Sequence, residues 1–143
     1  MHVDVILRSK GSAVYTIEEK LQLAETASLL MEKRIGAAVV LDEAGSVCGV
    51  LSERDIVHAL AKEGQAALAK PVMDYMTSNV VTCRLADTIN HCMELMTDRR
   101  IRHLPVVEEG HLKGIISIGD LVKWRIAETE MEAKAMRDYI ASG

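Results

Sequence analysis

Two spacings of apolar residues alternate along the first half of the chain, one typical of strands and one typical of amphipathic helices. Leu23, Ala27, Leu30 and Met31 recur at helical spacing. Short aliphatic runs bounded by turn residues predict strands. Ser52 precedes the second helix of this half and is placed to cap it. The pattern therefore predicts strands over 14–17, 35–41 and 47–51, and helices over 20–34 and 52–62.

The same order of elements returns in the second half of the chain. Ile89, Met93 and Met96 share one helical face, and Ser117 is placed to cap a last helix with no breaker before Gly143. Residues 1–13 are mixed in character, and we expect an extended lead-in or an edge strand there. The remaining predictions are strands over 80–82, 102–107 and 112–116, and helices over 87–100 and from residue 120 onward.

Sliding the chain along itself reveals an internal repeat of a β-α-β-β-α unit. At an offset of 66 residues, Thr16 aligns with Thr82 and Arg34 aligns with Arg100. The turn that follows is one residue longer in the first copy, so the offset then becomes 65 residues, and Gly49 aligns with Gly114 and Asp55 with Asp120. Each small sheet has an apolar face that it cannot bury alone, so the copies should pack about a pseudo-twofold axis. We therefore predict an α/β (α+β) fold with a lead-in (1–13), repeat 1 (14–64), a linker that also starts repeat 2 (65–79), repeat 2 (80–124) and a helical extension (125–143).

Each copy contains a Gly, two aliphatic residues, a Ser and, three residues later, an Asp, at the point where a strand runs into a helix. These are residues 49–55 and 114–120. A Ser at the N-cap accepts a hydrogen bond from an unpaired backbone N–H, and an Asp in the first turn faces the positive end of the helix dipole. The same helix end also suits an anion such as a phosphate. The motif is therefore compatible both with a helix cap and with a ligand site.

Composition and charge exclude several classes of partner. A net charge of −4 and a pI near 5.7 do not favour nucleic acid or an anionic membrane, and an aromatic content of 3% leaves few residues on which bases could stack. The longest unbroken apolar run, 37–41, is far too short to span a bilayer, so we expect a soluble cytoplasmic protein. Cys48, Cys83 and Cys92 form no C-x-x-C pair and are expected to be reduced, buried thiols.

No set of residues predicts catalysis or a metal site. His58, His91 and His111 stand singly, without a second ligand at metal spacing. No Ser/His/Asp, Cys/His or paired-carboxylate arrangement is evident. We therefore expect no catalytic cofactor, and we do not expect an enzyme.

Three patterns in register with the repeat resemble tandem cystathionine-β-synthase (CBS) domains, which pair into a regulatory unit called a Bateman module. They are the Gly–Ser–Asp junction in both copies, the stretch 72–77 (Val-Met-Asp-Tyr-Met-Thr) that typically opens a repeat, and 102–107 (Arg-His-Leu-Pro-Val-Val) before a turn. The resemblance covers residues 15–123. It implies a stand-alone sensor that binds AMP, ADP, ATP or NAD in two clefts between the repeats and reports to a protein partner.

The resemblance also implies roles for individual residues. Asp120 would accept hydrogen bonds from both ribose hydroxyls, and Ser117 would contact the phosphate or the ribose. The opening strand of one repeat would complete the cleft of the other. The expected nucleotide-binding residues are Asp120, Ser117, Thr16, Ile17 and Val39 in one cleft, and Asp55, Ser52, Thr82, Cys83 and Val106 in the other. The alternative is that the two Thr residues only fill their strands, as β-branched residues do.

The two clefts should differ in charge. Repeat 2 has Arg102 and His103 where repeat 1 has a Gly and an Ala, which adds cationic donors for a phosphate to the Asp120 cleft. Repeat 1 instead has Arg54 inside its junction, where an Arg could bind a phosphate bidentately. We expect the Asp120 cleft to bind more tightly, so Arg102→Ala should weaken nucleotide binding.

The last helix extends beyond the repeat and carries apolar residues that nothing later in the chain can cover, namely Trp124, Met131, Met136, Tyr139 and Ile140. We expect a homodimer contact there, or docking back onto the module's own surface. The alternative function is a protein–protein interaction or dimerisation module without a small-molecule ligand, in which both junctions are only caps. An enzyme such as inosine-monophosphate dehydrogenase, in which similar modules are embedded, would need a catalytic barrel for which 143 residues leave no room.

Overall fold

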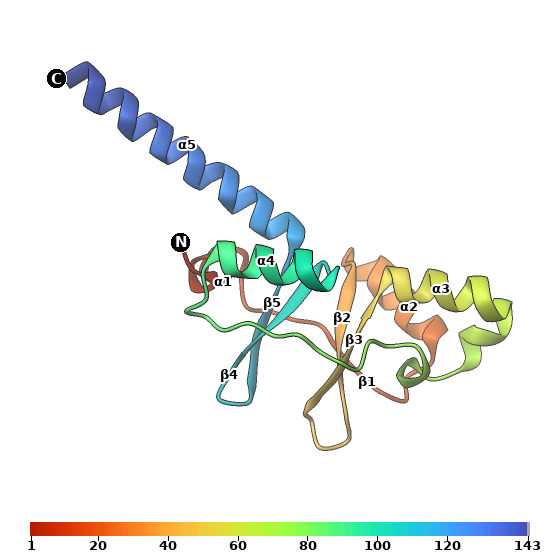
Figure 1. Ribbon diagram of the computed structural model, residues 1–143. Helices are drawn as coiled ribbons and strands as arrows, with labels where there is room; N and C mark the ends of the chain where they lie inside the picture. Colours follow the sequence, from red (N-terminus) through yellow and green to blue (C-terminus); the bar gives the residue numbers. More distant parts are fainter. Residues whose placement is uncertain (143) are drawn as a thin grey trace. The chain divides into compact units, whose positions relative to one another are not determined.

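The chain folds into two units, each built on one small sheet (Figure 1). The computed structural model describes residues 1–142. One unit, here called the Asp55 unit, consists of residues 13–81, and the other, the Asp120 unit, consists of residues 1–12 and 82–142. The predicted mixed α+β fold is confirmed, and each unit contains the helix, hairpin and following helix of one repeat.

In the Asp55 unit, three strands form a sheet in the order β1-β2-β3. β1 (Thr16–Glu18) is parallel to β2 (Ala37–Leu41), which is antiparallel to β3 (Val47–Ser52). The side chain of Asp42 fixes the β2–β3 turn, because it accepts hydrogen bonds from the backbone N–H groups of Ala44 and Ser46. The helices are α2 (Leu23–Lys33), α3 (Glu53–Glu63) and the short 3-10 helices η1 (Gly64–Ala69) and η2 (Val72–Asp74).

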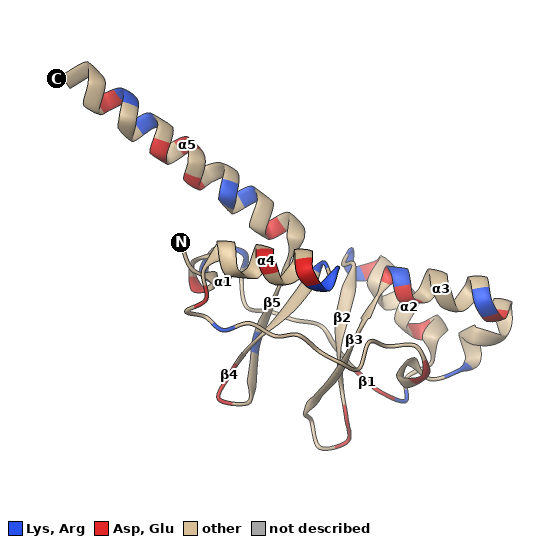
Figure 2. Ribbon diagram, in the orientation of Figure 1, with Lys and Arg blue, Asp and Glu red and all other residues tan. Residues whose placement is uncertain are grey.

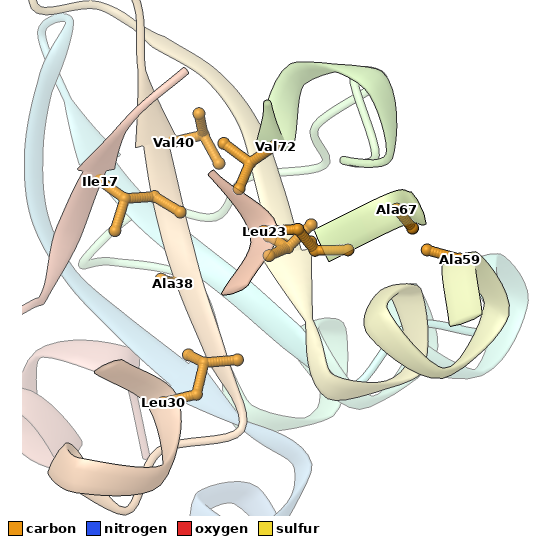
Figure 3. Close-up of a cluster of buried hydrophobic side chains, with 9 residues drawn as sticks. Ile17, Leu23, Leu30, Ala38, Val40, Ala59, Ala67 and Val72 are labelled. Atoms are coloured by element: carbon orange, nitrogen blue, oxygen red, sulfur yellow. The ribbon is translucent and has the colours of Figure 1, made fainter. Parts of the chain in front are cut away.

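An aliphatic core lies between this sheet and its helices (Figure 3). Ala38 and Val40, two residues apart on β2, point to the same face of the sheet and are fully buried. Leu23 and Leu30, two turns apart on α2, pack against that face. The core consists of Ile17, Leu23, Leu30, Ala38, Val40, Leu51, Ala59, Ala67 and Val72. It fixes the end of β3 and the start of α3, where the Ser–Asp motif lies.

In the Asp120 unit, β4 (His103–Glu108) and β5 (His111–Ser117) form an antiparallel hairpin. Its two-residue turn, Glu109 and Gly110, has positive φ at both positions (49° and 78°), the geometry whose twist suits a hairpin. α4 (Ile89–Arg99) precedes the hairpin, and α5 (Ile118–Ser142) follows it. The long last helix predicted from the sequence is therefore confirmed as far as Ser142, while Gly143 lies outside the described residues.

The strand predicted over 80–82 is wrong. A single parallel bridge joins Cys83 to Val106, as the counterpart of one β1–β2 pair in the Asp55 unit. The Cys83 N–H donates to the Pro105 carbonyl (3.0 Å), and the Val107 N–H donates to the Cys83 carbonyl (2.9 Å). Extending this ladder toward residue 81 would need an N–H from Pro105, which proline lacks. The strand is therefore reduced to one residue.

The extended lead-in or edge strand expected at the N-terminus is also wrong, because α1 (Val3–Lys10) is a helix. Val3, Ile6 and Leu7 lie three and four residues apart and are buried. Asp4 and Arg8, one turn apart, form an ion pair (2.9 Å) on the solvent side of the helix. These charges therefore lie on the polar face of an amphipathic helix.

α1 is the counterpart of the segment that opens repeat 2. Each unit contains the same two backbone contacts at equivalent positions. The Val3–Asp87 hydrogen bond (2.9 Å) and the His2–Thr88 bridge in the Asp120 unit correspond to the Val72–Leu21 hydrogen bond (2.8 Å) and the Pro71–Gln22 bridge in the Asp55 unit. The repeat therefore begins near the N-terminus. Each opening segment belongs to the unit that holds the sheet of the other copy.

Candidate functional site

Both strand–helix junctions form a hydrogen-bonded capping box. At the Asp55 junction, the Asp55 N–H donates to Ser52 Oγ (3.3 Å), and the Ser52 N–H donates to Asp55 Oδ2 (2.9 Å). At the Asp120 junction, the Asp120 N–H donates to Ser117 Oγ (3.2 Å), and the Ser117 N–H donates to Asp120 Oδ2 (2.9 Å). The predicted capping role of both Ser–Asp pairs is therefore confirmed.

The caps engage only one oxygen of each carboxylate. The hydrogen bonds of the two capping boxes, together with those from Ser52 Oγ to Asp55 and from Lys10 Nζ to Asp120, reach Oδ2 of the carboxylate. Both residues are partly exposed, and 23% of the Asp120 side chain is accessible. Because each carboxylate oxygen has two lone pairs, Oδ1 could accept hydroxyl donors from a ligand without loss of the cap.

Within residues 1–142, a cation lies against the Asp120 carboxylate but not against that of Asp55. Lys10, at the end of α1, donates from Nζ to Asp120 Oδ2 (2.6 Å) and to the Ile115 carbonyl (3.0 Å). Burial raises the pKa of Asp120, but hydrogen bonds from Lys10 and Ser117 and the charge of Lys10 outweigh it, so this pKa lies below its ordinary value. Asp120 is therefore held as a carboxylate beside a positive charge.

Arg102 and His103 lie beside the same junction. The Ile118 N–H donates to the Arg102 carbonyl (2.8 Å), and His103 is paired with Ser117 across the β4–β5 hairpin. The Asp55 junction has the same backbone contacts, but a Gly and an Ala occupy the two positions. Arg102 is exposed, as is Arg54 within the Asp55 junction. The structure thus brings Arg102, His103, Ser117 and Asp120 together in one unit.

The other predicted residues of the Asp55 unit lie on β1 and β2. Thr16 is exposed on β1 and is paired with Val39 on β2, which is fully buried. Ile17 belongs to the aliphatic core. Only Thr16 of these three therefore has an exposed side chain, and contact of these residues with the Asp120 junction stays a prediction.

The corresponding residues of the Asp120 unit are Thr82, Cys83 and Val106. Thr82 is exposed, whereas Cys83 and Val106 are buried. A hydrogen bond between the Cys83 and Cys92 thiols, together with burial, raises the pKa of Cys83, so this thiol stays neutral and packed. Contact of these residues with the Asp55 junction also stays a prediction.

Sequence reasoning missed Lys10. The helical spacing of Val3, Ile6 and Leu7 was the available signal, because it places residue 10 one turn beyond the buried face of α1. Nothing in the sequence pattern shows that this turn ends at the Asp120 junction. The contact depends on the association of the N-terminal segment with the second copy of the repeat.

Residues 1–142 bring together no group of three or more His, Cys, Asp or Glu side chains that could hold a metal ion. None of the helices in this range has both the length and the apolar character needed to cross a membrane.

Known proteins share this architecture. The crystal structure of the CBS-domain containing protein ATU1752 from Agrobacterium tumefaciens is 46% identical to this chain, with a TM-score of 0.85 over 87% of this chain and 92% of that one. The CBS domain protein PAE2072 from Pyrobaculum aerophilum, complexed with AMP, is 29% identical, with a TM-score of 0.75 over 84% and 89% of the chains. The CBS domain pair of protein MJ0100, in complex with 5′-methylthioadenosine and S-adenosyl-L-methionine, is 25% identical, with a TM-score of 0.79 over 90% and 98%.

Sequence comparisons agree with the structural ones. The mitochondrial CBS domain-containing protein CBSX3 of Arabidopsis thaliana is 31% identical over 118 residues, which are 80% of this chain but only 57% of that protein. The chain therefore spans less than two thirds of the length of this relative. A sequence model of the CBS domain matches residues 9–62 and 72–127, which together make up more than half of the chain. The chain belongs to the CBS domain family and carries two CBS domains in tandem, which form a Bateman module.

Proposed function

We propose that the protein is a cytoplasmic regulatory module, without catalysis of its own, that binds an adenosine nucleotide at its Ser–Asp junctions. AMP, ADP, ATP and NAD are the candidate ligands. Binding would change the affinity of the module for a regulated protein partner, and this requires unequal affinity of the ligand for two conformations of the module.

The observation that carries the proposal is the Asp120 junction. An ionised carboxylate whose cap and ion pair both use the same oxygen, Oδ2, suits the two hydroxyls of a ribose. Lys10 and Arg102, at the same junction, supply positive charge for a phosphate. The CBS pairs that were solved with AMP, or with 5′-methylthioadenosine and S-adenosylmethionine, support adenosine compounds as the ligand class.

Thermal unfolding in the presence of AMP, ADP, ATP, NAD and 5′-methylthioadenosine tests the proposal. A ligand at about a hundred times its dissociation constant stabilises the folded state by roughly 2.7 kcal/mol, which raises the unfolding midpoint by several degrees. Asp120→Asn should remove the shift, since it takes away the negative charge but keeps the size of the side chain. Ser117→Ala measures the cap in the protein without ligand, where it should lower the midpoint by an amount corresponding to about 1 kcal/mol. Because Ser117 is itself an expected ligand contact, this variant should also reduce the shift caused by a ligand.

The second candidate function is a protein-interaction module without a small-molecule ligand. Each capping box is closed by the Ser and Asp of the junction itself, and a purely structural role of these residues favours this alternative. If no adenosine compound raises the unfolding midpoint, and Asp120→Asn and Ser117→Ala act on stability alone, the interaction module replaces the sensor.

The proposal includes a homodimer formed through α5. Every residue from Thr129 to Ser142 is exposed, and Figure 1 shows the helix running clear of the rest of its unit. The exposed segment 129–142, taken alone, is close to the length of about 12–15 residues below which an isolated helix is marginally stable in water, which favours a partner. Apolar or small residues follow one another at alternating intervals of four and three residues, as on the seam of a coiled coil: Val122, Ile126, Thr129, Ala133, Met136 and Ile140.

The charges beside this seam suit a second copy of the helix in parallel. Basic residues (blue) and acidic residues (red) are interspersed along α5 (Figure 2). In a parallel pair, Arg125 would face Glu130 of the second copy, and Glu132 would face Arg137 of the second copy. Of the five apolar residues singled out in the sequence, only Met136 and Ile140 lie on this seam, because the others are spaced differently around the helix.

A further inference from the structure

We infer that Lys10 is a ligand-binding residue of the Asp120 junction, and that it selects adenosine compounds that carry a 5′-phosphate over those that do not. The inference rests on the proposed function, and it assigns to one residue the preference of the Asp120 junction for nucleotides over adenosine compounds without a phosphate.

Lys10 meets the carboxylate proposed to hold the ribose. Its ammonium group lies 2.6 Å from Asp120 Oδ2 and 3.0 Å from the Ile115 carbonyl oxygen. An ammonium has three donors, so one remains after these two bonds. About a third of the side chain is exposed, and its four-carbon stem is flexible, so Nζ can turn toward a ligand at the same carboxylate.

The repeat provides an internal comparison for this contact. Lys10 in α1 corresponds to Asn79 in the segment that opens repeat 2, by the spacing that aligns Val3 with Val72. Asn79 is exposed and, within residues 1–142, forms no hydrogen bond with Asp55. The Val50 carbonyl, the counterpart of Ile115, accepts the backbone N–H of Thr77 instead (3.0 Å). Only the Asp120 junction therefore has a cation delivered from the opening segment.

The phosphate is the ligand group that this cation fits. In a nucleoside 5′-phosphate, the phosphate lies within one side chain's reach of the ribose hydroxyls. The Asp120 carboxylate could therefore accept from the ribose hydroxyls while the Lys10 ammonium beside it donates to the phosphate. Arg102 at the start of the neighbouring strand adds a second positive charge. The neutral thioether of 5′-methylthioadenosine is a much weaker hydrogen-bond acceptor for Lys10 and Arg102 than a phosphate is. The positive sulfonium of S-adenosylmethionine would be repelled by these two cations.

Calorimetric titration with AMP and with 5′-methylthioadenosine tests the inference, because the two compounds share adenine and ribose and differ at the 5′ position. Lys10→Asn, which reproduces the residue of the other opening segment, should weaken AMP binding by about tenfold or more and change 5′-methylthioadenosine binding by less than about threefold. Lys10→Arg should retain the preference for AMP. Lys113→Asn, at an exposed lysine on β5 of the same unit, should leave both affinities unchanged.

A role of Lys10 limited to positioning Asp120 predicts a different result. Lys10→Asn would then weaken the binding of AMP and of 5′-methylthioadenosine by the same factor. This outcome would overturn the inference about Lys10 but not the proposed adenosine-binding site. Should Lys10→Asn fail to fold, equal affinity of the wild-type protein for AMP and 5′-methylthioadenosine would overturn it as well. If the wild-type protein binds neither compound, the proposed function itself fails, and the inference fails with it.

Discussion

Asp120 combines partial burial with two hydrogen bonds to one oxygen, and its charge should be visible in the stability of the fold. The pKa of Asp120 in the folded protein lies below its ordinary value of 3.8. The ionised carboxylate therefore stabilises the fold fully at pH values above 3.8, and this contribution is lost as the pH falls through the lower pKa of the folded state.

We expect the difference in unfolding midpoint between the wild-type protein and Asp120→Asn to be constant from neutral pH down to about pH 5 and to shrink in more acidic buffer. Calorimetric scans across this range measure it. Lys10→Asn should reduce the size of the difference, because it removes the ion pair that lowers the pKa of Asp120. A difference that does not change with pH would contradict the account of this carboxylate.

Arg100 ends α4 in the left-handed conformation, with φ 54° and ψ 44°, and Arg34 ends α2 in the same way. Residues with a Cβ are strained in this region by roughly 1–2 kcal/mol, and Gly is not. Arg100→Gly should therefore be neutral or stabilising by up to about 1 kcal/mol. Arg99→Gly, one residue earlier in helical conformation, should destabilise by about 1 kcal/mol. Denaturant unfolding compares the two, and equal losses would show that the left-handed backbone carries no strain.

At the scale of single elements, the glycine that begins each Gly–Ser–Asp junction is required for packing. A Cβ on Gly49 would collide with Met76 Sδ, lie 2.8 Å from Met76 Cγ and lie 3.1 Å from the Thr77 carbonyl oxygen. Gly114 has the same role on β5, where a Cβ would lie 2.9 Å from Leu7 Cδ2. Both neighbours belong to opening segments, so the two glycines let these segments approach the hairpins.

Gly49→Ala should therefore destabilise the protein by roughly 1–3 kcal/mol, as overpacking does. Gly119→Ala is the matched control, since its Cβ would meet only Ser117 Oγ at an ordinary 3.6 Å, and Ala in a helix is favoured over Gly by about 1 kcal/mol. Chemical denaturation gives both values. A stable Gly49→Ala variant would mean that Met76 and the Thr77 backbone can move aside.

Elements whose signals are local were predictable from the sequence. Ser52 and Ser117 cap helices where the Ser–Asp spacing placed them, and Gly110 turns the second hairpin. The conformations of α1 and of residues 80–82 could not be predicted in this way, because they depend on residues that are distant in the sequence. α1 is short and its N-cap residue makes no side-chain hydrogen bond, so its packing on the second copy stabilises it, whereas the strand depends on whether residue 105 carries an N–H.

The candidate site shows the same limit at a finer level. Ser117, Asp120, Arg102 and His103 are neighbours at one strand–helix junction, as the internal repeat predicts, because aligned positions of a hairpin and its following helix stay neighbours when the fold repeats. Their contact with a ligand stays a prediction. Lys10 is separated from Asp120 by 110 residues. Its contact with the carboxylate depends on an association of segments that no local periodicity reports.

At the scale of the whole molecule, the seam on α5 predicts the oligomeric state. Met136→Asp should convert a homodimer into a monomer, because it places a charge on the seam. Met131→Asp should leave the dimer intact, since Met131 has a similar exposure (65% against 60%) but lies opposite the seam. Analytical ultracentrifugation measures both variants. A monomeric wild-type protein, or equal effects of the two substitutions, would contradict dimerisation through this helix.

The exchange of opening segments between the units has a consequence for dissecting the chain. The boundaries of the sequence duplication do not coincide with those of the folded units, since residues 1–12 belong with residues 82–142 and residues 71–81 belong with the first sheet. A fragment cut at the repeat boundaries would carry the opening segment of the other unit and would lack the one that packs on its own hairpin.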